Sequence, residues 1–237
     1  MSLITYIFLF SGALIGGITV LFVKLNNKTL KLFLSFSGAY LFSICVLHLI
    51  PEIYTQTNNT VGIYILLGFF LQIFLEFFSE GIEHGHVHIH KHEHNKFPFA
   101  VMLSLSVHSF LEGMPLTQNL INNPEIYHTL LVGIILHNIP VSIALMSMLI
   151  GSNVSKRSSI IGLVAFALMA PLGAITNQFI SSGIDTTTYM NNIMGVVIGI
   201  FLHISTTILF ESSENHRFNL LKFLIILMGA SLALIHF

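Results

Sequence analysis

Two polar clusters interrupt apolar segments of this 237-residue chain, and both contain residue types that bind metal ions. The first runs His-Ser-Phe-Leu-Glu from His108 to Glu112, and the second runs His-Asn-Ile-Pro from His137 to Pro140. In a helix, residues four apart share one face, so the His108 and Glu112 side chains point the same way. Imidazole and carboxylate together suit a borderline divalent ion such as zinc. The two clusters therefore predict that the protein holds a metal ion within the membrane.

Two other interpretations of these clusters stay open from the residues alone. His108 and Glu112 could form a buried hydrogen-bonded pair that locks two helices together, and His137 could play a similar structural part. A metal-activated water beside the His-x-x-x-Glu pattern would instead indicate a membrane-embedded hydrolase. The chain lacks a His-Glu-x-x-His motif and a recognisable nucleophile–histidine pairing, so we expect no enzyme. Polar groups at membrane depth are costly and usually mark a pathway, which favours the metal site.

The elements that position these residues are predicted to be membrane-spanning helices. Hydrophobic residues make up 54% of the chain and charged residues 8%, against roughly 25% charged in soluble domains. The mean hydropathy is +0.85. A spanning helix needs about 20 mostly apolar residues. Eight segments qualify, which predicts an all-α membrane protein with one transmembrane domain over residues 1–237: 3–23, 30–50, 61–81, 97–121, 127–150, 158–180, 190–211 and 218–236.

The basic residues predict the orientation of this bundle. All nine Lys and Arg residues lie in four alternate connections, between the first and second, third and fourth, fifth and sixth, and seventh and eighth helices. The positive-inside rule places these connections in the cytoplasm, so both termini are expected to be extracytoplasmic. We expect the first apolar run to be a spanning helix and the protein to lie in the cell membrane, inner or plasma. No basic block suggests nucleic acid; the expected partners are the metal ion, the lipid bilayer and a second copy of the chain in a homodimer.

A histidine-rich tract occupies the cytoplasmic loop predicted over residues 84–96. Its alternating histidines are His84, His86, His88, His90, His92 and His94. Neutral imidazole is a common ligand for zinc, copper and nickel, so the tract is interpreted as a flexible tether that captures metal in the cytoplasm. The alternative is a solvated linker without a metal-binding role.

Four further polar residues lie along the predicted helices. His48 and Glu52 are near the outer end of the second helix, where an entrance site and a plain interfacial position are equally compatible with the sequence. Glu76 approaches the cytoplasmic end of the third helix, either on an exit route or at a hydrated helix end. His203 lies within the seventh helix and is predicted to be a pathway residue.

The chain resembles the ZIP (Zrt/Irt-like) metal transporters. The resemblance covers eight spans, a histidine-rich loop between helices 3 and 4, and the two signatures that begin at His108 and His137. It implies a ZIP-like helix bundle that moves a divalent transition metal, zinc first, toward the cytoplasm by alternating access around a midplane site. At that site the resemblance implies that His108, Glu112 and His137 bind the ion, with Asn138 as an auxiliary ligand. Protonation of the site would weaken binding, so transport is expected to depend on pH. The alternative is a degenerate family member that binds or senses metal without transporting it.

The chain departs from the family pattern where the family holds a second metal. The positions that would support this second ion are occupied by Ser109, Asn138, Val141 and Ala170, and none is a carboxylate. A dication in a low-dielectric site needs negative ligands to offset its desolvation. We therefore expect that one metal position survives and that the second is lost.

Overall fold

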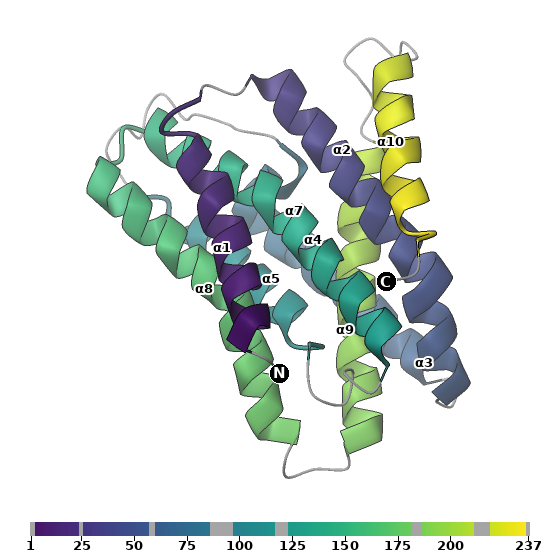
Figure 1. The fold of residues 1–237 in the computed structure, drawn as a ribbon. Helices are drawn as coiled ribbons and strands as arrows, with labels where there is room; N and C mark the ends of the chain where they lie inside the picture. Colours follow the sequence, from purple (N-terminus) through teal and green to yellow (C-terminus); the bar gives the residue numbers. More distant parts are fainter. Residues whose placement is uncertain are drawn as a thin grey trace.

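The protein is described here by a computed structural model that covers residues 3–23, 26–56, 60–85, 97–116, 123–181, 186–210 and 219–235. Within these ranges all regular structure is helical, and the helices make eight passes through one bundle (Figure 1). The passes are α1 (Leu3–Thr19), α2 (Asn27–Ile44) continued by η1 (Cys45–Leu49) and α3 (Ile50–Gln56), α4 (Val61–Ser79), α5 (Phe99–Gly113), α7 (Pro124–Gly151), α8 (Lys156–Ser181), α9 (Thr186–Phe210) and α10 (Leu220–Leu232). A short 3₁₀ turn, η2 (Ile82–His84), follows α4.

The predicted all-helical architecture is confirmed, although the helices differ in length. Five of them are long and apolar enough to cross a membrane, while α1, α5 and α10 are shorter apolar helices. The prediction for α5 is wrong at its C-terminal end, because the helix stops at Gly113 rather than near residue 121. Pro115 has no backbone N–H with which to continue the helical hydrogen bonds, and Met114 N donates to Leu111 O at 3.2 Å in a closing turn.

The surface of the bundle is apolar and several of its buried positions are polar. Large side chains such as Phe22, Phe77 and Phe210 are 82%, 80% and 81% exposed. Meanwhile Gln72, Glu83, His108, Glu112 and His137 are completely buried. An apolar exterior of this extent would be a liability in water and is suited to lipid. The protein is a multi-pass membrane protein.

Helix pairs approach closely where glycine leaves room. The closest pairings join α4 to α9, α1 to α7, α5 to α8 and α2 to α10. A Cβ atom on Gly68 of α4 would lie 1.9 Å from Val196 O of α9, so only glycine fits there. The same applies to Gly199 of α9, whose Cβ would lie 2.0 Å from Ile65 O. Small residues of this kind let membrane helices pack backbone against backbone.

The basic residues in the described ranges gather at one end of the bundle. Helices α2, α8 and α10 begin at the same end, the upper end in Figure 1. Their first five residues contain Lys28 and Lys31, Lys156 and Arg157, and Lys222, respectively. Helix α1 begins and α10 ends toward the opposite end (Figure 1), so the arrangement agrees with the charge asymmetry read from the sequence.

Candidate metal centre

A buried group of three potential ligands lies between α5 and α7, at His108, Glu112 and His137. We refer to it as the α5–α7 cluster. One ligand atom from each residue lies within 4.8 Å of the other two. His108 Nε2 is 3.1 Å from Glu112 Oε1, and the centroids of the two imidazole rings are 5.9 Å apart. The three residues predicted from the two signatures therefore come together, although they belong to helices separated in sequence.

Apart from His108 Nδ1, the ring nitrogens and carboxylate oxygens of this cluster are buried without a hydrogen-bond partner. His108 Nε2, both oxygens of Glu112, both ring nitrogens of His137 and Asn138 Oδ1 all have none. A buried polar group without a partner costs about 1–3 kcal/mol, and more when it is charged. A structural pair would be expected to satisfy its own atoms, whereas a set of ligand atoms left unpaired fits a divalent ion as the missing partner.

The backbone around the cluster is fixed by helix packing. A Cβ atom on Gly113, next to Glu112, would lie 2.0 Å from Ala170 O of α8. One on Gly173 of α8 would lie 1.9 Å from Phe110 O of α5. The two glycines thus let α5 and α8 touch along their backbones beside the ligand residues. On the other side, α7 is a 28-residue helix with Pro140 inside it, which removes one backbone hydrogen bond a turn beyond His137.

The four positions that depart from the family pattern are all buried: Ser109, Asn138, Val141 and Ala170. Val141 is 0% exposed, so it packs inside the protein and not against lipid. No carboxylate or imidazole beyond the three residues of the α5–α7 cluster joins that ligand group in the described part of the chain. Asn138 contributes an unpaired amide oxygen at most.

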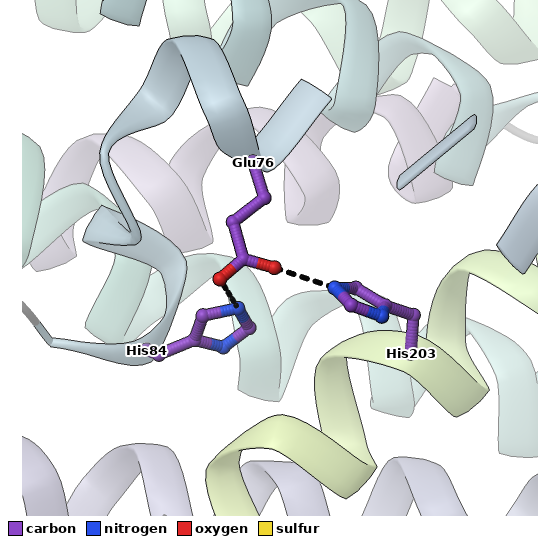
Figure 2. A group of neighbouring side chains, drawn as sticks. All are labelled: Glu76, His84 and His203. Atoms are coloured by element: carbon purple, nitrogen blue, oxygen red, sulfur yellow. Dashed lines mark hydrogen bonds and ion pairs between the residues drawn. The ribbon is translucent and has the colours of Figure 1, made fainter. Parts of the chain in front are cut away.

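A second group of potential ligands lies between α4, η2 and α9, and Figure 2 shows its three members. We refer to Glu76, His84 and His203 as the α4–α9 cluster. The Glu76 carboxylate lies between the two imidazoles, with Oε2 2.5 Å from His203 Nε2 and Oε1 3.3 Å from His84 Nε2. Glu76 is 27% exposed by side chain, whereas His84 is buried. This cluster is therefore less enclosed by the protein than the α5–α7 cluster.

The position of His84 differs from its predicted place in a flexible tract. His84 ends the η2 turn and is 1% exposed, because the turn folds back from α4 and brings the ring against α9. Left-handed backbone at Gly81 and Gly85, with φ of 72° and 86°, begins and ends this turn. The other five histidines of the tract lie outside the described residues.

His48 and Glu52 do not join a ligand group in the described ranges. His48, placed by the π-helical turn η1, lies with Nε2 2.8 Å from Ala233 O and Nδ1 3.7 Å from Glu125 Oε1. Asn123 Nδ2 donates to Glu52 Oε1 at 3.1 Å. These three contacts join neighbouring helix ends to one another. The entrance site and the plain interfacial position, equally compatible with the sequence at His48 and Glu52, both stay open.

An apolar helical bundle with buried imidazole and carboxylate groups is the architecture of a multi-pass membrane protein whose interior could hold a metal ion. The family model described as ZIP Zinc transporter matches residues 83–236, more than half of the chain. The chain therefore belongs to the ZIP zinc transporter family, as its motifs predicted, and is a metal transporter of that family. A comparison with curated proteins gives no match.

Proposed function

We propose that the protein moves a divalent transition metal ion, zinc first, toward the cytoplasm, and that the α5–α7 cluster binds the ion within the membrane. The observation that carries this proposal is the set of buried ligand atoms without partners at His108, Glu112 and His137. Two imidazoles and one carboxylate leave one position of a tetrahedral zinc site open. An incomplete shell allows the ion to leave, which transport requires. Asn138 Oδ1 is the auxiliary ligand in this proposal.

The α4–α9 cluster is proposed as a second ion position, on the cytoplasmic side of the first. It lies near the end of α4 that leads into the histidine-rich tract, and Glu76 is partly exposed there. An ion leaving the α5–α7 cluster would meet the same ligand types in a more hydrated place. Alternating access requires that the first site open in turn toward each side of the membrane.

Uptake into proteoliposomes tests the proposed function directly. Purified protein in liposomes that contain a zinc-sensitive dye should accumulate zinc faster than empty liposomes, and a panel of cobalt, nickel, iron, manganese and cadmium would identify the preferred ion. Zinc binding in detergent without any uptake would instead favour a metal sensor, the alternative left open by Val141 and Ala170.

Glu76→Gln should slow zinc uptake. It should abolish ion binding at the α4–α9 cluster and not affect ion binding at the α5–α7 cluster. The substitution removes the only carboxylate of the α4–α9 cluster, and a dication needs a negative ligand there. Calorimetry on protein with alanine at His86, His88, His90, His92 and His94 should find two bound zinc ions per chain, and one after Glu76→Gln. Glu80→Gln, at the end of the same helix but outside the cluster, is the matched control. An unchanged stoichiometry would remove the α4–α9 cluster from the pathway.

Cysteine labelling tests the orientation on which the inward direction depends. Single cysteines at Asn58 and Thr187 should react with an impermeant maleimide from outside the cell, and those at Asn27 and Ser155 should react only after permeabilisation. The native Cys45 is fully buried, so it should give little background. Labelling with the opposite pattern would reverse the proposed direction.

A further inference from the structure

A chain of buried hydrogen bonds leads away from the α5–α7 cluster to the η2 turn. Gln72, in the middle of α4, is 0% exposed. Its Oε1 lies 3.1 Å from His108 Nδ1, and its Nε2 donates to Glu83 Oε1 at 3.4 Å. Ser79 Oγ donates to the other oxygen, Glu83 Oε2, at 2.6 Å. Glu83 is also 0% exposed, and it precedes His84 of the α4–α9 cluster.

The donors and acceptors along these hydrogen bonds determine which ring nitrogen of His108 has the proton. A carboxylate accepts hydrogen bonds only, so Glu83 requires the NH₂ group of Gln72 on its side. The carbonyl oxygen of Gln72 must then face His108, and it accepts from Nδ1–H. A neutral imidazole has a single N–H, so its lone pair is on Nε2. Nε2 is the atom that points at Glu112, 3.1 Å away, in the α5–α7 cluster.

We propose that Gln72 is the positioning residue of the α5–α7 cluster: it holds His108 in the tautomer and ring orientation that present Nε2 to the ion, and Glu83 orients the Gln72 amide. The inference rests on the proposed function, because it assumes that His108 binds the ion. Gln72 itself lies behind the ring and does not touch the ion. A hydrogen-bonded partner on the far nitrogen of a ligating histidine raises ligand basicity and is typically worth about 10- to 100-fold in metal affinity.

A purely structural role for Gln72 predicts a different outcome. The Gln72 amide would then only hold α4 and α5 together by a hydrogen bond, as Ser104 Oγ does by donating to Leu75 O at 2.6 Å. Removing either hydrogen bond would weaken the packing of the same helix pair and leave the tautomer and coordinating nitrogen of His108 unchanged. Ser104→Ala is therefore the matched control, since it deletes a buried hydrogen bond between the same two helices.

The test measures zinc affinity by calorimetry and the coordinating nitrogen of His108 by ¹⁵N-histidine NMR on the zinc-loaded full chain. Gln72→Met, close to glutamine in volume, should weaken zinc binding at the α5–α7 cluster about 10- to 100-fold. It should also allow mixed Nδ1 and Nε2 coordination. Ser104→Ala should keep the wild-type affinity and coordination through Nε2. A His108→Ala sample assigns the resonance.

A double substitution supplies the rescue. In Gln72→Glu with Glu83→Gln, the carboxylate at position 72 still accepts from His108 Nδ1–H. The amide at position 83 then donates a second hydrogen bond to that carboxylate. The pair should recover zinc affinity to within about threefold of wild type, because a carboxylate is as good an outer partner for a ligating histidine as a carbonyl. This variant also decides the matter if Gln72→Met does not fold.

The outcomes separate this inference from the proposed function. If His108→Ala abolishes zinc binding while Gln72→Met binds zinc as wild type does, Gln72 is not a positioning residue and the metal site stands. Equal losses from Gln72→Met and Ser104→Ala, with coordination through Nε2 in both, would also overturn the inference in favour of the structural role. Failure of the double substitution to bind zinc would do the same. If His108→Ala binds zinc normally, the proposed function itself fails.

Discussion

His108→Ala, Glu112→Gln and His137→Ala should each lower zinc uptake by more than about 100-fold. Each change removes one of three protein ligands, and loss of even an outer partner of a ligand costs about 10- to 100-fold in affinity. The remaining ligand atoms have no hydrogen-bond partner to replace the ion, so the deleted contact is not compensated locally. Zinc uptake into proteoliposomes, at matched protein reconstitution, gives the measurement.

The control for these variants is His128→Ala. His128 is an exposed histidine on α7, the helix that also contains His137, and it lies outside both ligand clusters in the described chain. Its replacement should leave uptake unchanged. Wild-type uptake in all three cluster variants would mean that the ion passes through the membrane elsewhere.

Gly113→Ala should destabilise the protein and weaken metal binding together. The added Cβ would lie 2.0 Å from Ala170 O, and a backbone oxygen on a packed helix cannot rotate away as a side chain can. Helices α5 and α8 would have to separate, which costs about 1–3 kcal/mol in a well-packed interior. Because Glu112 is the preceding residue, its carboxylate would move with α5. The melting temperature and the zinc affinity of the same sample should both fall.

Gly162→Ala on α8 is the comparison for this effect. Its Cβ would approach Phe97 Cζ at 3.2 Å, and an aromatic ring can shift by a few tenths of an ångström. The melting temperature should change little. If Gly113→Ala melts as wild type does, the backbone contact between α5 and α8 is not as close as the structure places it.

The sequence predicted the helical bundle well because hydrophobicity over about 20 residues is a strong signal. The helical spacing of His108 and Glu112 predicted that these two side chains share a face, and the resemblance to the ZIP family predicted that His137 joins them. The end of α5 was missed, because the apolar pattern continues past Gly113 while Pro115 stops the helix. A periodic pattern says where a helix is favourable and is weaker evidence for where it ends.

Two other features depend on tertiary contacts that spacing does not reveal. The sequence places His84 at the start of a histidine tract interpreted as flexible. In the structure, left-handed backbone at Gly81 and Gly85 allows the η2 turn to bring His84 against α9. Gln72 was not singled out from the sequence. The one signal available there is that an amide within a membrane helix needs a partner, and its partners lie 36 and 11 residues away in the chain. Close approach of α4 to α5, and of η2 to α4, α7 and α9, is set by packing, which a single sequence does not specify.

Anomalous scattering from zinc-soaked crystals, recorded above and below the zinc absorption edge, is the most direct test of the proposed site. We predict one anomalous peak among His108 Nε2, Glu112 and His137, within about 2.0–2.2 Å of each ligand atom. Because Ser109, Asn138, Val141 and Ala170 supply no carboxylate, no second peak should lie between α5 and α7. In His108→Ala crystals the peak should vanish. Two peaks between these helices would contradict the loss of the second ion position, and no peak there would contradict the site itself.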